Sequence, residues 1–203
     1  MVMLLNLKFN KIIEILKSGG VGVMPTDTLY GLVGSAFSKQ AIERIYKIKN
    51  RDVSKPLIVL ISKISDLKKF DICNTFHHGE KCLDSVQSVQ SLTLNKFWPG
   101  KVSIILPCAS TKFKYLHRGT KSIAFRFPKS KSLIEVMKKT GPLVAPSANP
   151  EGLKPAENIK QAKKYFKDAI DFYLSSGTLK SKPSAIIKFE KNGEIKILRG
   201  ITR

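Results

Sequence analysis

The hydrophobic residues of this chain recur with two spacings, one typical of helices and one typical of strands. Helical spacing predicts helices over Leu4–Leu16, from an N-cap at Ser38 onward, over Ser65–Phe70, over Lys131–Lys139, and from Glu157 or Asn158 to Phe166. Short apolar or alternating runs predict strands at Val21–Met24, Leu57–Ile61, Val102–Leu106, Ser122–Phe127, Leu143–Ala145, Ile170–Leu174, Ser184–Phe189 and Glu194–Leu198. Asn192-Gly193 predicts a hairpin between the last two strands. We therefore expect one α/β domain over residues 1–203, with a twisted mixed sheet flanked by helices.

The strand predicted at Ser122–Phe127 has two different faces. Its phenylalanines and Ile123 share one face, while Arg126 lies on the other face with small residues. An unpaired arginine on a buried face is costly, so Arg126 needs a partner. That partner is either a carboxylate elsewhere in the fold or an anionic ligand.

The first predicted strand leads into a polar loop. Thr26, Asp27 and Thr28 follow Pro25 at its end, and we interpret this stretch as a strand-to-helix loop. In open α/β sheets, ligands bind beyond the carboxyl ends of the strands. The same three side chains also suit the N-cap of a following helix, so the loop is either a ligand site or a cap.

A basic cluster lies between the second helix and the next strand. Lys47 and Lys49 fall at the helix end, where cations interact favourably with the helix dipole. Arg51 and Lys55 lie beyond the helix, and Pro56 prevents its continuation. The helix dipole therefore accounts for the first two cations and less well for the other two.

A second polar loop follows the strand predicted at Leu143–Ala145. Prolines fix both ends of the sequence PSANP, and Ser147 and Asn149 supply hydrogen-bond donors and acceptors. The loop is either a turn closed by these side chains or a second wall of a site. Together with the basic cluster, it favours a site that binds a polyanion.

The amino-acid composition adds only weak evidence about the protein's binding partners. A formal net charge of +21 favours anionic partners such as nucleotides, pyrophosphate or RNA. Because the lysines are spread over the whole chain, this is weak evidence for a nucleic-acid surface. No apolar run reaches the roughly 20 residues that span a bilayer, and the N-terminus lacks the features of a signal peptide. We expect a cytoplasmic protein.

The cysteines predict neither disulfides nor a metal site. Cys73, Cys82 and Cys108 are odd in number and contain no CxxC pair. His77 and His78 lie between the first two, but their spacing matches no familiar zinc pattern.

An ordered set of motifs carries a family resemblance. The chain contains PTDTLYGL at Pro25–Leu32, the KxR of Lys49 and Arg51 followed by KPL, FRFP at Phe125–Pro128, PSANP at Pro146–Pro150, PSAII at Pro183–Ile187 and LRG at Leu198–Gly200. Together these motifs resemble the TsaC/YrdC family, the L-threonylcarbamoyladenylate synthases. The resemblance covers nearly the whole chain and matches the short, single-domain type.

The resemblance implies a YrdC-like fold with a large, open, basic cavity. It implies a nucleotidyltransferase that joins L-threonine, bicarbonate and ATP to give threonylcarbamoyl-AMP and pyrophosphate, with Mg²⁺ accompanying ATP. Partner proteins then transfer the threonylcarbamoyl group to adenosine 37 of tRNAs that read ANN codons, and direct tRNA or RNA binding is conceivable. Catalysis of this kind rests on positioning and electrostatics and needs no general base. A closing loop, at residues 112–120 or 175–184, is expected to exclude water.

The resemblance also assigns roles to individual residues. The signature and catalytic residues are Lys49, Arg51, Ser147 and Asn149. The ATP-binding residues are Arg51, Lys55, Ser122, Asn149 and Arg199. The threonine-binding residues are Thr28, Arg126, Ser147 and Ser184. No protein side chain is expected to bind a metal.

Two positions depart from the family pattern, and two other functions compete with the synthase. Leu60 stands where many longer members have a histidine that touches threonine, and Ser103 replaces a common threonine. One alternative is a non-catalytic RNA-binding module, which the charge favours. The other is carbamoyl transfer in hydrogenase maturation, where similar domains occur inside larger proteins; the short chain argues against it.

Overall fold

The computed structural model of the chain describes residues 2–72, 94–189 and 194–200. Its helices are α1 (Val2–Lys17), α2 (Lys39–Lys49), α4 (Lys114–His117), α5 (Lys131–Thr140) and α6 (Ile159–Phe166), with 3-10 turns η1 (Ile64–Phe70) and η3 (Thr111–Phe113). Its strands are β1 (Val21–Pro25), β2 (Tyr30–Ser35), β3 (Ile58–Leu60), β4 (Val102–Pro107), β5 (Ser122–Arg126), β6 (Leu143–Val144), β7 (Phe172–Tyr173), β8 (Ala185–Phe189) and β9 (Ile195–Arg199). None of the helices in these ranges is long and apolar enough to cross a membrane.

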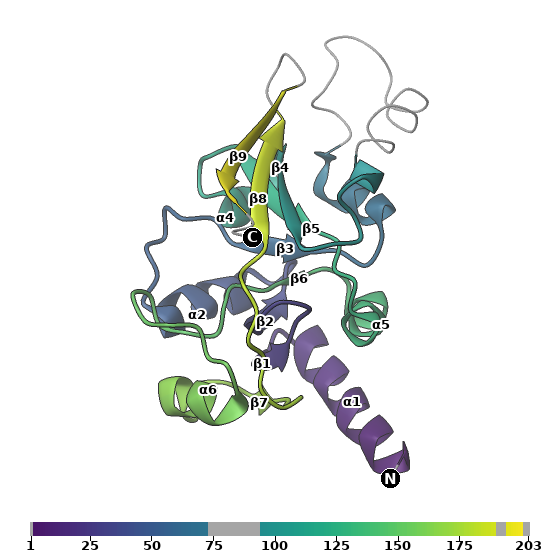
Figure 1. Cartoon of the computed structure of the whole chain (residues 1–203), viewed down its shortest axis with the longest axis vertical. Helices are drawn as coiled ribbons and strands as arrows, with labels where there is room; N and C mark the ends of the chain where they lie inside the picture. Colours follow the sequence, from purple (N-terminus) through teal and green to yellow (C-terminus); the bar gives the residue numbers. More distant parts are fainter. Residues whose placement is uncertain (1, 73–93, 190–193, 201–203) are drawn as a thin grey trace.

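The described strands form one mixed sheet in the order β7-β1-β2-β6-β3-β5-β4-β8-β9. Three neighbouring pairs are parallel (β1/β7, β3/β5 and β4/β8), and the other described pairs are antiparallel. Figure 1 shows the sheet with α1 and α5 on one side and α2 on the other. The predicted α/β architecture with a mixed sheet is therefore confirmed.

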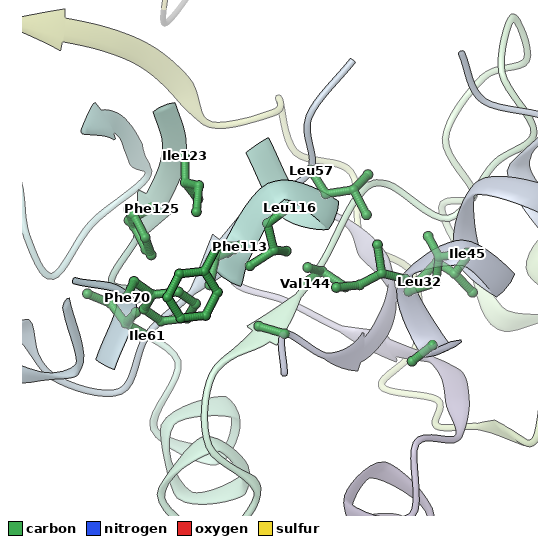
Figure 2. Close-up of a cluster of buried hydrophobic side chains, with 14 of the residues drawn as sticks. Leu32, Ile45, Leu57, Ile61, Phe70, Phe113, Leu116, Ile123, Phe125 and Val144 are labelled. Carbon is green, nitrogen blue, oxygen red and sulfur yellow. The ribbon is translucent and has the colours of Figure 1, made fainter. Parts of the chain in front are cut away.

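The helices cover the two faces of the sheet through separate clusters. On one face, Ile12 and Leu16 of α1 pack with Leu133 and Val136 of α5. The cluster on the other face is larger and joins α2, α4 and the 3-10 turns (Figure 2). Burial of these side chains is the main term that stabilises the sheet.

Aromatic rings form the centre of the larger cluster. Phe70 lies between Phe125 and Phe113, with ring centroids 5.0 and 5.3 Å apart respectively (Figure 2). Phe125 faces this cluster because it alternates with Arg126 along β5, as the sequence pattern predicts. The same alternation places Arg126 on the opposite face.

Several local predictions are confirmed by side-chain caps. Ser38 begins α2 and accepts a hydrogen bond from the Ala41 N–H, and Asn158 begins α6 in the same way. The final pair of strands, β8 and β9, is antiparallel, as expected. The turn between them, at Asn192-Gly193, lies outside the described residues, as do Cys73, His77, His78 and Cys82.

Two predictions about loops are wrong. The polar loop after β1 does not lead into a helix, because β2 pairs with β1 in an antiparallel hairpin that includes Pro25 and Tyr30. The basic stretch at residues 112–120 is not an open loop either. It contains α4, whose Leu116 is buried in the larger cluster, and it is anchored there by Phe113.

Candidate active site

An open cavity lies on the sheet face that carries Arg126. Its volume is about 180 Å³, and its walls come from the β1–β2 turn, the loop before β3, the loop after β6 and the loop before β8. Strand register explains why these walls meet. Leu60 of β3 pairs with Arg126 of β5, and Ile186 of β8 pairs with Arg199 of β9, so all four project to the same side.

Three arginines line this cavity: Arg51, Arg126 and Arg199. Burial lowers the pKa of Arg126, and the nearby charge of Arg199 lowers it further, against the opposing effect of Asp27. Burial also lowers the pKa of Arg199. Guanidinium groups nevertheless stay charged at neutral pH, so the cavity attracts anions. The expected basic character of the cavity follows from these residues rather than from the surface lysines.

Arg126 has two partners in the β1–β2 turn. Its Nη2 donates to Asp27 Oδ1 at 2.6 Å, and its Nη1 donates to Thr28 Oγ1 at 3.2 Å. The exposed fractions of the two charged side chains are only 5% and 9%. The second oxygen of Asp27 accepts the Lys129 N–H. Asp27 therefore holds Arg126 and does not cap a helix, because no helix follows the turn.

One nitrogen of Arg126 has no partner. Its Nε is buried and makes no hydrogen bond to any described residue. A buried donor without an acceptor costs free energy. Of the two partners that the sequence left open for Arg126, the carboxylate is present, and an anionic ligand would meet the guanidinium from the cavity that Arg126 lines.

Lys49 holds the loop after β6 in place through hydrogen bonds to its backbone. This lysine is only 2% exposed, and its Nζ donates to Ser147 O at 2.5 Å and to Asn149 O. Its own carbonyl accepts the Glu151 N–H. Burial, with a contribution from the charge of Arg51, lowers the pKa of Lys49 to about 8. The helix dipole alone therefore does not account for Lys49, because its ammonium is buried and bonded to the loop after β6.

Ser147 and Asn149 play different parts in this loop. Ser147 lines the cavity and its hydroxyl donates to Asn149 Oδ1 at 2.6 Å. The amide of Asn149 donates to the carbonyls of Pro150 and Leu153. Asn149 thus closes the turn, while Ser147 faces the cavity, so both interpretations of the PSANP loop hold for one residue each.

Comparison with known protein families gives a match over most of the chain. The sequence profile of Sua5_yciO_yrdC, described as "Telomere recombination", matches residues 14–200. The chain belongs to the Sua5/YciO/YrdC family.

Curated relatives in this family carry one name. A protein of Hahella chejuensis is 30% identical over 179 residues, which cover 87% of this chain and 90% of the relative, and one of Marinobacter nauticus is 33% identical over 175 residues, covering 84% and 85%. Both are named threonylcarbamoyl-AMP synthase. The structure of P. abyssi Sua5 complexed with L-threonine has a TM-score of 0.78 at 22% identity, which shows a common fold. It matches 95% of this chain, and the chain spans about half its length, 53%.

The predicted site residues of this family member divide into two groups. Those that line the cavity are Thr28, Arg51, Arg126, Ser147, Ser184 and Arg199. The remaining predicted residues, Lys49, Lys55, Ser122 and Asn149, lie outside its wall. Ser122 begins β5, four residues or roughly 13 Å from Arg126 along the strand, and bonds to Thr120. Its contact with a nucleotide stays a prediction.

The second arginine-bearing wall is built around Ser184. Arg199 Nε donates to Ser184 O at 2.9 Å, and the Ser184 hydroxyl lies 3.0 Å from the hydroxyl of Ser103. Ser103 is fully buried, so the substitution noted in the sequence sits behind the cavity wall. Leu60, the other departure from the family pattern, lines the cavity itself. The two expected closing segments differ: Pro183 borders the cavity, whereas no residue of 112–120 does so.

Sequence reasoning missed the residues that hold the site together. Asp27 and Glu151 each make an ion pair with a predicted site residue, Arg126 and Lys55 respectively. Asp27 belongs to the polar loop that the sequence singled out, but its partner lies 99 positions away. Glu151 directly follows the PSANP motif. In neither case does the spacing along the chain indicate the partner.

The lowered pKa of Lys49 predicts how the free energy of unfolding changes with pH. In the unfolded chain this pKa returns to its ordinary value of 10.5, so between about pH 8 and pH 10.5 the unfolded state binds more protons than the folded state. The contribution of Lys49 to the free energy of unfolding therefore rises with pH in this window. We expect the unfolding free energy of the wild type minus that of Lys49→Met to increase from pH 8 to pH 10 in urea titrations. A difference that stays flat or shrinks would contradict the assigned shift.

Proposed function

We propose that this chain is a threonylcarbamoyl-AMP synthase, which joins L-threonine, bicarbonate and ATP to give threonylcarbamoyl-AMP and pyrophosphate. The observation that carries the proposal is Arg126, a buried arginine in the wall of a cavity that Arg51 and Arg199 also line. It lies in a chain whose relatives carry the name of this enzyme. Both also favour the synthase over a non-catalytic RNA-binding module.

The part of the cavity around Arg126 suits the amino acid. The whole cavity has a volume of about 180 Å³, below the roughly 300–1,000 Å³ of pockets that enclose drug-sized ligands, so a nucleotide would extend beyond it. The carboxylate of L-threonine would bind Arg126, and the hydroxyls of Thr28, Ser147 and Ser184 would line its remaining surface. The solved Sua5 complex with L-threonine supports a threonine site in this fold.

The nucleotide would extend from the region of Arg126 out of the cavity, past Arg51 and Arg199. Arg51 lines the cavity where the loop before β3 borders it, and Lys55 lies four residues further along. These cations would hold the phosphates, and Arg199 would contact the nucleotide from the opposite wall. Cations placed where charge develops stabilise a transition state more effectively than solvent does.

The described residues contain no ready-made cage for Mg²⁺. No group of three His, Cys, Asp or Glu side chains among the described residues is arranged to hold a metal ion. The carboxylates near the rim, Asp52 and Glu151, already accept hydrogen bonds from Ser54 and Lys55. This arrangement fits a metal that enters with ATP and is held mainly by its phosphates. When bound, Mg²⁺ would neutralise part of the phosphate charge.

The chemistry then needs positioning rather than acid–base groups. The threonine amine attacks bicarbonate and a carbamate forms with loss of water. A carbamate oxygen attacks the α-phosphorus of ATP, a P–O bond to the β-phosphate breaks, and pyrophosphate leaves. Arg126 fixes one reactant, and Arg51 stabilises charge on the leaving group.

The product is a mixed anhydride, which is consumed by a further group transfer. We propose that partner proteins pass the threonylcarbamoyl group to adenosine 37 of tRNAs that read ANN codons. A cytoplasmic location follows from such a role. Direct binding of tRNA by this chain would appear as salt-sensitive binding of structured RNA.

The test is pyrophosphate release by the purified chain with Mg-ATP. We expect release that requires both L-threonine and bicarbonate, and the nucleotide product should be threonylcarbamoyl-AMP by mass spectrometry. Absence of threonine-dependent release would refute the synthase. An RNA-binding module instead predicts tight, salt-sensitive binding to structured RNA that survives Lys49→Ala and Arg51→Ala, whereas these changes should abolish turnover by the enzyme.

A further inference from the structure

Glu151 joins the two loops that form the phosphate end of the proposed site. Its backbone N–H donates to the carbonyl of Lys49 at 2.7 Å. Its Oε2 accepts the backbone N–H of Asp52 at 2.7 Å, and its Oε1 accepts from Lys55 Nζ at 2.5 Å. One acidic residue therefore contacts the backbone of Lys49 and of Asp52 and the side chain of Lys55.

The backbone of this basic loop is held independently of the Lys55 side chain. Arg51 Nε donates to the carbonyl of Lys55 at 3.2 Å, and the Asp52 N–H is held by Glu151. The side chain of Lys55 is different, since it is 54% exposed and lies outside the cavity wall. A lysine has a flexible four-carbon stem, so its ammonium can change partner while the loop stays in place.

We propose that Glu151 is an internal competitor for the substrate's phosphates: its carboxylate holds the Lys55 ammonium until a polyphosphate displaces it. This inference rests on the proposed function for the identity of the polyphosphate. Lys55 donates to the Glu151 carboxylate and lowers the pKa of that group, so the two are paired at neutral pH. A partly exposed ion pair of this kind is weak, so a ligand with several negative charges can replace it.

The competitor sets nucleotide affinity without touching the amino-acid end. Threonine carries one carboxylate, and its proposed partner Arg126 is held by Asp27 rather than by Glu151. Removing the carboxylate of Glu151 should therefore tighten ATP and pyrophosphate by similar factors and leave threonine unaffected. The Lys55–Glu151 ion pair breaks each time a polyphosphate binds, which weakens binding, and it forms again when pyrophosphate leaves.

Glu151→Gln is the variant that separates the two roles of this side chain. Glutamine keeps an oxygen that can accept the Asp52 N–H, but it removes the charge that holds Lys55. Glu135→Gln is the matched control, because Glu135 lies on α5, also pairs with a lysine at 2.7 Å, and is absent from the cavity wall.

The experiment measures binding of inorganic pyrophosphate to the full chain by calorimetry. We expect Glu151→Gln to bind pyrophosphate about five-fold more tightly than the wild type, the scale of one partly exposed ion pair. Glu135→Gln should bind as the wild type does. In a Lys55→Gln background, adding Glu151→Gln should change the affinity less than two-fold, because the pair is already broken.

Two results would overturn the proposal. One is unchanged or weaker pyrophosphate binding by Glu151→Gln, which would make Glu151 a support for the loop. The other is tightening that persists in the Lys55→Gln background, which would reflect the general field of one fewer carboxylate. Threonine-dependent turnover of the wild type is measured alongside, so a failure of the proposed function is recognised separately from a failure of this inference.

Discussion

Arg126→Met is expected to remove nearly all threonine-dependent pyrophosphate release. Methionine keeps much of the side-chain volume but lacks the guanidinium that is proposed to bind the carboxylate of L-threonine. Losing one partner of a buried, hydrogen-bonded charge pair costs roughly 2–5 kcal/mol, which corresponds to about a 30- to 5,000-fold loss in kcat/KM for L-threonine. Steady-state kinetics with L-threonine varied at saturating Mg-ATP measure this loss. Lys129→Met is the control, since Lys129 is exposed and only its backbone contacts Asp27.

The same substitution should also destabilise the fold, for a reason that can be tested separately. Without Arg126, Asp27 becomes a buried carboxylate with no cation, which costs about 3–5 kcal/mol in comparable pairs. Adding Asp27→Asn removes that charge, so the double variant should recover part of the lost unfolding free energy. It should not recover turnover. Recovery of both by the double variant, or full activity of Arg126→Met, would show that Arg126 has only a structural role.

Patterns with a short period along the chain allowed most of the fold to be predicted. Alternation in Ser122–Phe127 separates a face that packs in the core from a face that carries Arg126, and the register with β3 confirms this. The N-cap at Ser38 is confirmed, and of the two predicted caps of the last helix, Glu157 and Asn158, the structure has Asn158; a cap is made within four residues. Such features depend on neighbours in sequence, so the sequence alone indicates them.

The features that could not be predicted depend on partners distant in sequence. The β1–β2 hairpin was taken for a strand-to-helix loop because Pro25 and the small polar residues after it suit both structures. The local pattern explains Lys49 equally well by the dipole of α2, whereas in the structure the ammonium bonds to the loop after β6. Its partners lie about a hundred positions away, and nothing in the local pattern indicates them.

Lys49→Met is expected to lower turnover by roughly 10²-fold or more while the protein still folds. Lys49 does not line the cavity, so its effect is transmitted through the loop whose carbonyls it holds. That loop carries Ser147, and a displacement of about 1 Å in a positioned group can cost 10²-fold in rate. Steady-state kinetics with ATP and L-threonine varied in turn would measure the loss.

Stability should change far less than activity in this variant. Burying an ammonium is costly, and replacing it with an apolar side chain of similar length relieves that cost. The carbonyls of Ser147 and Asn149 lose a donor, which costs about 1–3 kcal/mol for a group left unsatisfied, and Ser147 O still accepts the Asn149 N–H. The two effects partly cancel. Lys47→Met is the matched control, because Lys47 lies on the same helix end but is exposed. If Lys49→Met kept turnover within ten-fold of the control, the loop would hold its position without the lysine and Lys49 would not be a positioning residue.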